Sequence, residues 1–103
     1  MTTPTSSPPI KADILAQLRR LKPELADRYG VSQIGVFGSI ARNEAQPQSD
    51  IDIVVQMEPN LFKRFQLKIE LEALFNRDVD VLRYWHGMNP YLKTRIDREA
   101  IYV

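Results

Sequence analysis

The chain is 103 residues long, carries 14 Lys and Arg against 13 Asp and Glu, and contains no cysteine. This length suits one compact domain, the balanced charge argues against a dedicated binder of nucleic acid or anionic membranes, and the lack of cysteine excludes disulfides, thiolate zinc sites and thiol nucleophiles. No apolar run is long enough to span a bilayer, and residues 1–9 lack the apolar core of a signal peptide. We therefore expect a soluble, cytoplasmic protein.

The N-terminal part should consist of a tail and an interrupted helix. Residues 1–9 are small, hydroxylated and rich in proline, which predicts a flexible tail before a single domain over residues 10–103. Apolar residues then recur every three or four positions across residues 10–25, which is the period of one helix face. Because proline removes a helix hydrogen bond, Pro23 predicts a break into two helical pieces, the second of them capped by Gly30.

Three segments have the composition of β-strands. Residues 34–37 form the first, which stops at the Gly-Ser pair of residues 38–39 and is followed by one turn of helix. After a polar loop, residues 50–55 alternate Asp with Ile and Val before becoming wholly apolar, which predicts a second strand. Residues 77–82 predict a third strand.

Two further helices complete the expected fold. The long helix between the second and third strands should face the core with a broad apolar stripe and carry Lys and Glu on its other side. The stripe consists of Leu61, Phe65, Ile69 and Leu74, with Phe62 and Leu71 filling in. Asn89 and Pro90 fit the N-cap and the first position of a last helix. Together these elements predict an α+β domain with two layers, in which helices pack on one face of a small mixed sheet of three to four strands.

Three aspartates are the candidate catalytic carboxylates and metal ligands: Asp50, Asp52 and Asp80. Because side chains two apart in a strand share a face, Asp50 and Asp52 should project together while the Ile and Val residues face the core. Asp80 lies in another apolar segment and would join them from a neighbouring strand. Carboxylates this close repel one another unless a cation lies between them, and hard oxygen ligands favour Mg²⁺ or Mn²⁺ over Zn²⁺. Since three carboxylates can hold two ions, we expect a site for two Mg²⁺.

Gly38 and Ser39 form the candidate phosphate-binding turn. Glycine lets the backbone approach an anion without a Cβ in the way, and the following helical turn presents free N–H groups beside the Ser39 hydroxyl. Arg42 lies one turn further on, where its guanidinium can add a charge-assisted contact to the same phosphates. We therefore predict that these three residues bind a nucleotide.

Each part of this pattern is ordinary by itself, but the combination is specific. A lone Gly-Ser pair is usually a simple turn, and Asp-x-Asp on an edge strand is often only a solvated face. Here Gly38-Ser39 is followed, after ten residues, by Asp50-x-Asp52, and a later strand carries Asp80. The pattern resembles the signature of the polymerase-β-like nucleotidyltransferase superfamily, and the chain length resembles that of its minimal nucleotidyltransferase branch.

The resemblance implies a polymerase-β-like fold over nearly the whole domain. In that superfamily the Gly-Ser turn holds a nucleoside triphosphate, the paired aspartates bind the divalent ions, and a third aspartate completes the site, in some members as the base for the attacking hydroxyl. Asn43 departs from the family pattern, in which glycine commonly follows the arginine; Asn is the non-glycine residue that best tolerates a positive φ. Asp78 shares a strand face with Asp80, so both are candidates for the third carboxylate, and the flanking valines favour Asp80.

Minimal nucleotidyltransferases of this kind resemble the antitoxin half of a two-component module whose partner is a helical HEPN ribonuclease toxin. By this resemblance we expect Mg²⁺-dependent transfer of AMP from ATP to a hydroxyl of the toxin, with tyrosine as the expected acceptor, within a hetero-oligomer of antitoxin and toxin. Direct binding of nucleic acid or of a membrane is not expected.

Two alternatives remain open at the level of sequence. The chain could be a non-catalytic antitoxin that neutralises its toxin by binding through exposed apolar and arginine side chains. It could also be the catalytic subunit of a small-molecule nucleotidyltransferase of the aminoglycoside-modifying type. Tyr84 and Trp85 fit core packing, stacking on adenine or contact with a partner. The sequence leaves open the acceptor, the nucleotide preference, the number of AMP units transferred and the stoichiometry of the complex.

Overall fold

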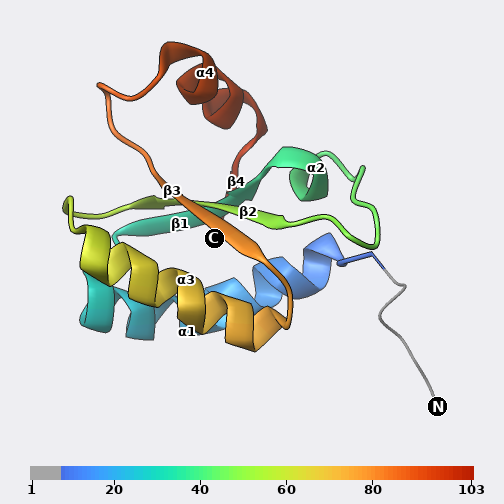
Figure 1. Cartoon of the computed structure of the whole chain (residues 1–103), viewed down its shortest axis with the longest axis horizontal. Coiled ribbons are helices and arrows are strands. Elements are labelled where there is room, and N and C mark those ends of the chain that lie inside the picture. The colour runs from blue at the N-terminus through green and yellow to red at the C-terminus, as the bar shows by residue number, and fades with distance from the viewer. Residues whose placement is uncertain (1–7) are drawn as a thin grey trace.

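Residues 8–103 are described by a computed structural model, shown in Figure 1. Residues 1–7, which make up most of the predicted tail, lie outside this part, so the tail stays a prediction. The described residues form four helices and four strands, in the order α1 (Lys11–Tyr29), β1 (Gln33–Phe37), α2 (Gly38–Ala41), β2 (Ile51–Gln56), α3 (Leu61–Phe75), β3 (Val79–Arg83), α4 (Pro90–Glu99) and β4 (Ile101–Tyr102).

The four strands build one mixed sheet in the order β3-β2-β1-β4. β1 is antiparallel to both β2 and β4, whereas β2 and β3 are parallel and are connected through α3. The predicted α+β class with a small mixed sheet is therefore confirmed. β4 is an edge strand that the sequence pattern does not reveal, because two residues are too few to show a period.

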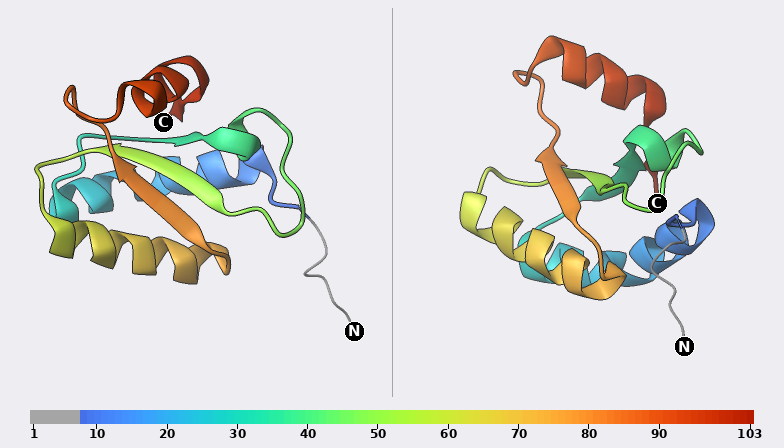
Figure 2. Two further views of the ribbon diagram at one scale, coloured as in Figure 1. Left: turned by 45° about the horizontal axis from the view of Figure 1, so that its top comes forward. Right: turned by 45° about the vertical axis from the view of Figure 1, so that its right-hand side comes forward.

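Helices cover both faces of this sheet, as Figures 1 and 2 show from three directions. α1 and α3 lie together on one face, and the large core between them and the strands includes Leu18, Ile53 and Leu67, all fully buried. α4 lies on the opposite face, over a small apolar cluster formed by Phe37, Val54 and Ile96. The predicted packing of helices on one face is therefore incomplete, since it describes α1 and α3 but omits α4.

α1 continues through Pro23 without interruption, so the predicted break in this helix is wrong. Proline removes one backbone N–H and with it one helix hydrogen bond. The continuous helix keeps Ile14, Leu18 and Leu25 buried on one face, and burying each such side chain contributes about 1.5–3 kcal/mol, which outweighs the lost bond. The predicted cap is confirmed, because Gly30 ends the helix with a φ of 70°.

α3 exposes most of the stripe that was expected to face the core. Leu61 is 75% exposed, Phe65 60% and Ile69 49%, whereas Leu67 and Leu71 are fully buried against the sheet. The predicted face is therefore wrong for Leu61, Phe62, Phe65 and Ile69. It is right for Leu71, which is fully buried, and for Leu74, which packs partly buried against the core. The helix carries apolar side chains on two sides, and periodicity alone does not tell which side meets the sheet. We call the exposed group the α3 apolar patch; it consists of Leu61, Phe62, Phe65 and Ile69.

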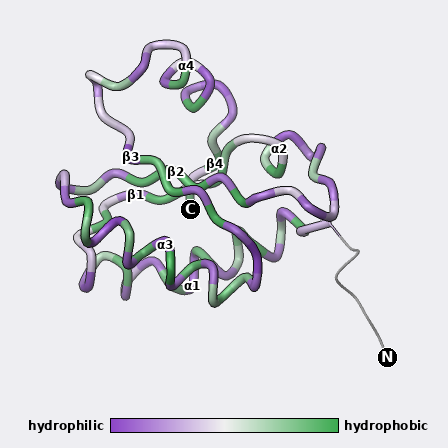
Figure 3. The backbone as a smooth tube through the Cα atoms, viewed as in Figure 1, coloured by the Kyte–Doolittle hydropathy of each residue, from purple (hydrophilic) through white to green (hydrophobic). Residues whose placement is uncertain are grey.

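The last helix begins where the sequence predicts it. The Asn89 side chain accepts a hydrogen bond from the Leu92 backbone N–H at 3.1 Å, and Pro90 occupies the first turn of α4. Figure 3 shows that the strands at the centre of the molecule are predominantly apolar, while the loop between α2 and β2 is predominantly polar. No helix within residues 8–103 combines the length and the apolar content that crossing a bilayer requires.

Candidate active site

β2 places Asp52 on the polar side of an otherwise apolar strand. Ile51, Ile53 and Val55 are buried in the main core, as the alternation predicts, and Asp52 is only partly buried. In the antiparallel pairing Asp52 lies opposite Phe37, the last residue of β1. The carboxylate therefore stands next to the point where β1 ends and the Gly-Ser turn begins.

β3 brings Asp80 directly beside Asp52. The two residues are register partners in the parallel pairing of β2 and β3, so their side chains project from the same face of the sheet. Asp50 comes one residue before β2, at the same end of the strand. Asp52 and Asp80 thus share one face of the sheet, and Asp50 lies at the same end of β2, near enough for its charge to act on Asp52.

The charges of the two neighbouring aspartates act on Asp52. Burial raises the pKa of Asp52 above its ordinary value, and the charges of Asp80 and Asp50 raise it further. The positive charges of Arg95 and Arg42 oppose this rise in the pKa of Asp52 without cancelling it. The charged form of Asp52 is therefore disfavoured, as expected of a site that binds a cation or carries out acid–base chemistry.

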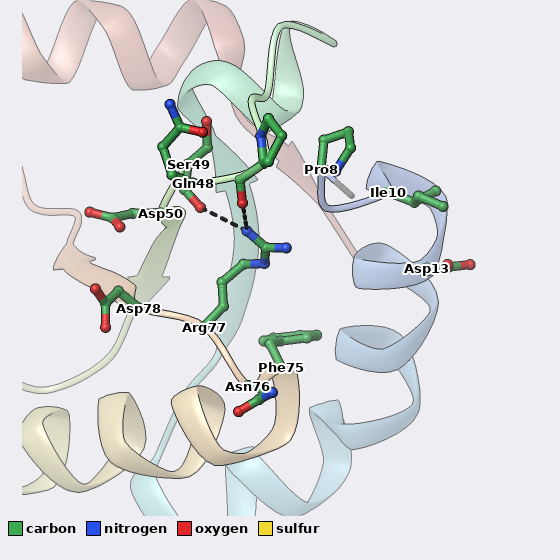
Figure 4. A pocket seen from close by; sticks show the side chains of 11 residues that line it. Pro8, Ile10, Asp13, Gln48, Ser49, Asp50, Phe75, Asn76, Arg77 and Asp78 are labelled. Carbon is green, nitrogen blue, oxygen red and sulfur yellow. Dashed lines mark hydrogen bonds between the residues drawn. The ribbon is translucent and has the colours of Figure 1, made fainter. Parts of the chain in front are cut away.

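Asp78 occupies a different position from Asp80. It lies just before β3, where its backbone carbonyl accepts the N–H of Ile51 at 3.0 Å, and it lines a cavity of about 540 Å³ together with Asp50. In Figure 4 both carboxylates point away from Arg77, which donates to the carbonyl oxygens of Pro47 at 2.7 Å and Ser49 at 3.3 Å. Arg77 therefore fixes the loop that leads into β2, and the carboxylate that pairs in register with Asp52 is Asp80.

The donor set fits Mg²⁺ if the nucleotide completes it. Within residues 8–103 no three His, Cys, Asp or Glu side chains are arranged to hold one metal ion together. Mg²⁺, however, is usually held by one or two carboxylates together with phosphate oxygens and water. Asp52 and Asp80 supply two carboxylates from adjacent strands. The assignment of two metal ions to Asp50, Asp52 and Asp80 stays a prediction.

Gly38 packs against the Asp52 carboxylate more closely than any other residue could. A Cβ at this position would lie 2.2 Å from Asp52 Oδ2, and the backbone has a φ of 77°, which favours glycine. The Gly-Ser turn and the aspartate are therefore one unit rather than two neighbouring motifs. Asn43 also has a positive φ, 62°, so the predicted tolerance of Asn at this family position is confirmed.

Two residues of α4 also enter this site, and the sequence pattern does not reveal them. One carboxylate oxygen of Glu99, Oε1, accepts the Gly38 backbone N–H at 3.2 Å and Arg42 Nη1 at 3.0 Å. Arg95, one turn earlier on α4, donates to the same oxygen at 3.5 Å. An Arg and a Glu four residues apart are common on helix surfaces, so only the position of α4 identifies this pair as part of the site.

The aromatic pair after β3 divides between two roles. Tyr84 packs against the small cluster under α4, and its hydroxyl donates to Asp97 at 2.7 Å, in agreement with core packing. Trp85 is 44% exposed and has the Arg83 guanidinium over its ring at 5.7 Å, so core packing is wrong for this residue. Adenine stacking is not tested by this arrangement.

Comparison with known proteins identifies the family. Residues 18–103 match the model of the nucleotidyltransferase domain. The protein adenylyltransferase MntA of Thermococcus cleftensis is 44% identical over 84 residues, which cover 80% of this chain and 84% of MntA. The solved structure of a minimal nucleotidyltransferase matches with a TM-score of 0.74 and 32% identity, over 90% of this chain and 95% of the other. The chain therefore belongs to the nucleotidyltransferase domain family.

A more distant likeness extends the comparison of the fold. A structure of a tri-AMPylated Shewanella oneidensis HEPN toxin in complex with an MNT antitoxin contains a chain that matches with a TM-score of 0.65 and 18% identity. The match covers 90% of this chain and 71% of the other. At this identity the likeness shows a shared fold.

Proposed function

We propose that this chain, as a member of the nucleotidyltransferase domain family, transfers AMP from ATP to a hydroxyl of a partner protein. MntA, to which it is similar, is a protein adenylyltransferase, which supports protein as the acceptor. For the partner we propose a HEPN-type toxin, so that the chain acts as an antitoxin. This finer assignment follows the sequence resemblance, and the shared fold of an MNT antitoxin is compatible with it.

The observation that carries the proposal is the contact between the Gly-Ser turn and the paired carboxylates. Gly38 lies against Asp52, and Asp52 lies in register with Asp80. A triphosphate bound on the turn would therefore have its phosphates next to two carboxylates. A divalent cation bound between them would neutralise charge on the phosphates and on the departing pyrophosphate. This arrangement suits nucleotidyl transfer better than simple nucleotide storage.

Each residue of the site has its own role in the proposed reaction. We assign Gly38, Ser39 and Arg42 to the triphosphate, and Asp50 and Asp52 to the metal. We assign Asp80 to the metal as well and, by the family resemblance, to accepting the proton of the attacking hydroxyl. The new bond joins the acceptor oxygen to the α-phosphorus. The bond between the α-phosphorus and the oxygen that bridges to the β-phosphate breaks, and this oxygen leaves with pyrophosphate. The protein's contribution is to position the reactants and to balance charge, so no covalent enzyme intermediate is needed.

The α3 apolar patch offers a place for the partner to dock. Its four large side chains are between 49% and 75% exposed on one helix, and such a group commonly marks a binding surface. Arg64 and Lys68 lie beside this patch, where they line one pocket with Leu61 and Phe65. Lys68 also pairs with Glu72 at 2.6 Å, so Arg64 carries most of the free positive charge at this surface. We assign this surface to a partner helix with apolar side chains flanked by acidic ones, because that charge complements α3.

Transfer of label tests the proposed reaction. The chain, its co-encoded partner, Mg²⁺ and ATP labelled on the α-phosphate should together yield labelled partner, whereas ATP labelled on the γ-phosphate should not. Asp52→Asn should lower the rate about a hundredfold or more, since it removes charge at the reacting phosphate. Asp27→Asn, an exposed change on α1, is the matched control and should leave the rate unchanged. Label that persists in Asp52→Asn, or that never reaches any co-encoded protein, would contradict the proposal.

Variants that affect either docking or catalysis distinguish the proposed enzyme from an antitoxin that acts by binding alone. Phe62→Ser combined with Phe65→Ser should weaken the complex by about tenfold or more in a pull-down titration, because exposed aromatics dominate such interfaces. Tyr91→Ser, which changes an equally exposed aromatic outside the patch, should not. If Asp50→Asn with Asp52→Asn still neutralised the toxin fully, binding alone would suffice. Equal loss of binding with Tyr91→Ser would refute the assigned surface.

A further inference from the structure

Glu99 occupies the group of donors that the proposed nucleotide site would use. Its Oε1 accepts hydrogen bonds from the backbone N–H of Gly38 at 3.2 Å, from Arg42 at 3.0 Å and from Arg95 at 3.5 Å. The Glu99 side chain is only 13% exposed, so this is a held position and not a chance surface contact. One carboxylate oxygen thus joins α4 to the Gly-Ser turn.

The chemistry of these three donors suits a phosphate as well as a carboxylate. A guanidinium pairs with either anion, and the Gly38 backbone N–H can donate to any oxyanion that approaches closely. Gly38 and Arg42 are the residues assigned above to the triphosphate. A phosphate oxygen and the Glu99 carboxylate therefore compete for the same hydrogen bonds.

The balance of charge points in the same direction. Asp50, Asp52 and Asp80 already place negative charge at this end of the sheet, and a triphosphate would add more. A carboxylate that stayed among the donors would repel the phosphates. Arg42 and Arg95 compensate two charges at most, and Glu99 takes up part of that compensation as long as it stays in place.

We propose that Glu99 is an internal substitute for phosphate, which holds Arg42 and Arg95 ready and is displaced when a nucleoside triphosphate binds. Arg95 then becomes a further phosphate-binding residue, and Glu99 is a positioning residue that lowers nucleotide affinity. This inference rests on the proposed function, because it assumes that the Gly-Ser turn receives the triphosphate. Only molecules in which Glu99 is displaced can bind the triphosphate. The measured affinity is therefore the intrinsic affinity multiplied by the fraction of molecules in which Glu99 is displaced.

Calorimetric titration of the chain with Mg²⁺-ATP, and separately with Mg²⁺-tripolyphosphate, tests the inference without the partner protein. Glu99→Gln keeps the shape but removes the charge, and it should tighten binding of both probes about three- to tenfold. Arg95→Gln should weaken binding about tenfold, since it removes a charge-assisted contact. In the double variant the gain from Glu99→Gln should shrink, because the two side chains act through one contact.

Glu44→Gln is the matched control. Glu44 also pairs with Arg42, at 2.9 Å, and its replacement by Gln changes the net charge of the chain as much as Glu99→Gln does. Unlike Glu99, Glu44 makes no side-chain contact with Gly38 or Arg95 in the described structure. It should change the affinity less than about twofold. Melting temperatures of all variants are recorded as well, because a Glu99 that only fastens α4 would lower stability when replaced and would leave affinity unchanged or weaker.

The outcomes separate this inference from the function beneath it. Wild-type binding with no tightening in Glu99→Gln would overturn the role of Glu99 alone. Tightening for ATP but not for tripolyphosphate would also overturn it, because the competition would not be with phosphates. If neither the wild type nor Glu99→Gln bound either probe, the proposed function would fail and this inference with it. Binding by Glu99→Gln alone would support both.

Discussion

The two faces of the sheet differ in the kind of residues that line them. The face under α1 and α3 is lined by apolar residues such as Leu18, Ile53 and Leu71, and no polar or charged residue in the described part is buried. The face toward α2 and α4 has a small apolar cluster around Ile96, and beside it lie charged groups such as Asp52. The first face stabilises the fold, whereas the second holds carboxylates that repel one another, which Arg42 and Arg95 offset only in part. Stability and activity are therefore separable by mutation.

The largest expected effect belongs to the apolar face. Leu71→Ala should lower the free energy of unfolding by about 3 kcal/mol, because it removes a fully buried side chain and leaves a cavity. Leu61→Ala makes the same change on the same helix at a residue that is 75% exposed, and should cost no more than about 0.5 kcal/mol. Urea unfolding of both variants measures the difference. Equal losses would show that the two sides of α3 do not differ as described.

Gly38→Ala tests the closest packing on the charged face. The φ of 77° disfavours alanine, and the added Cβ would force the Asp52 carboxylate to move, so we expect a loss of about 1–2 kcal/mol in stability together with loss of nucleotide binding. Gly30→Ala is the control, since Gly30 has a similar φ of 70° and nothing lies within 4 Å of its added Cβ. It should show the conformational cost with nucleotide binding intact. Normal binding by Gly38→Ala would separate the turn from Asp52.

The smallest effect has the opposite sign. The raised pKa of Asp52 means that the folded chain favours its protonated form over its charged form. Asp52 therefore contributes full stability below the pKa of the unfolded state, about 3.9, and this contribution is lost as the pH rises through the pKa of the folded state. Asp52→Asn should therefore stabilise the chain by about 0.5–1 kcal/mol at pH 7. The gain should disappear below about pH 4.

Chemical unfolding in EDTA, without nucleotide, isolates this effect from any bound metal. Asp27→Asn, on the exposed side of α1, controls for the loss of one negative charge and should leave the free energy of unfolding at pH 7 unchanged. A destabilised Asp52→Asn at neutral pH would mean that hydrogen bonding to the charged carboxylate outweighs burial and repulsion.

The parts of this protein that the sequence predicts are those in which cause and effect lie within a few residues. The alternation that turns Asp52 away from the core depends on a single strand, as does the burial of Ile53. The cap of α4 by Asn89 depends on one turn of helix, and so does the end of α1 at Gly30. Such features follow from backbone geometry and are readable without a partner segment.

Tertiary structure decided the rest, because packing joins residues that are far apart in the chain. Pro23 stays within a continuous helix because the core on the other side of α1 outweighs one missing hydrogen bond. Phe65 is exposed because the sheet takes up the opposite side of α3. Glu99 reaches Gly38, 61 residues earlier, because α4 folds back over the sheet. No local pattern encodes such a contact, since its free energy comes from surfaces that exist only once the chain has folded.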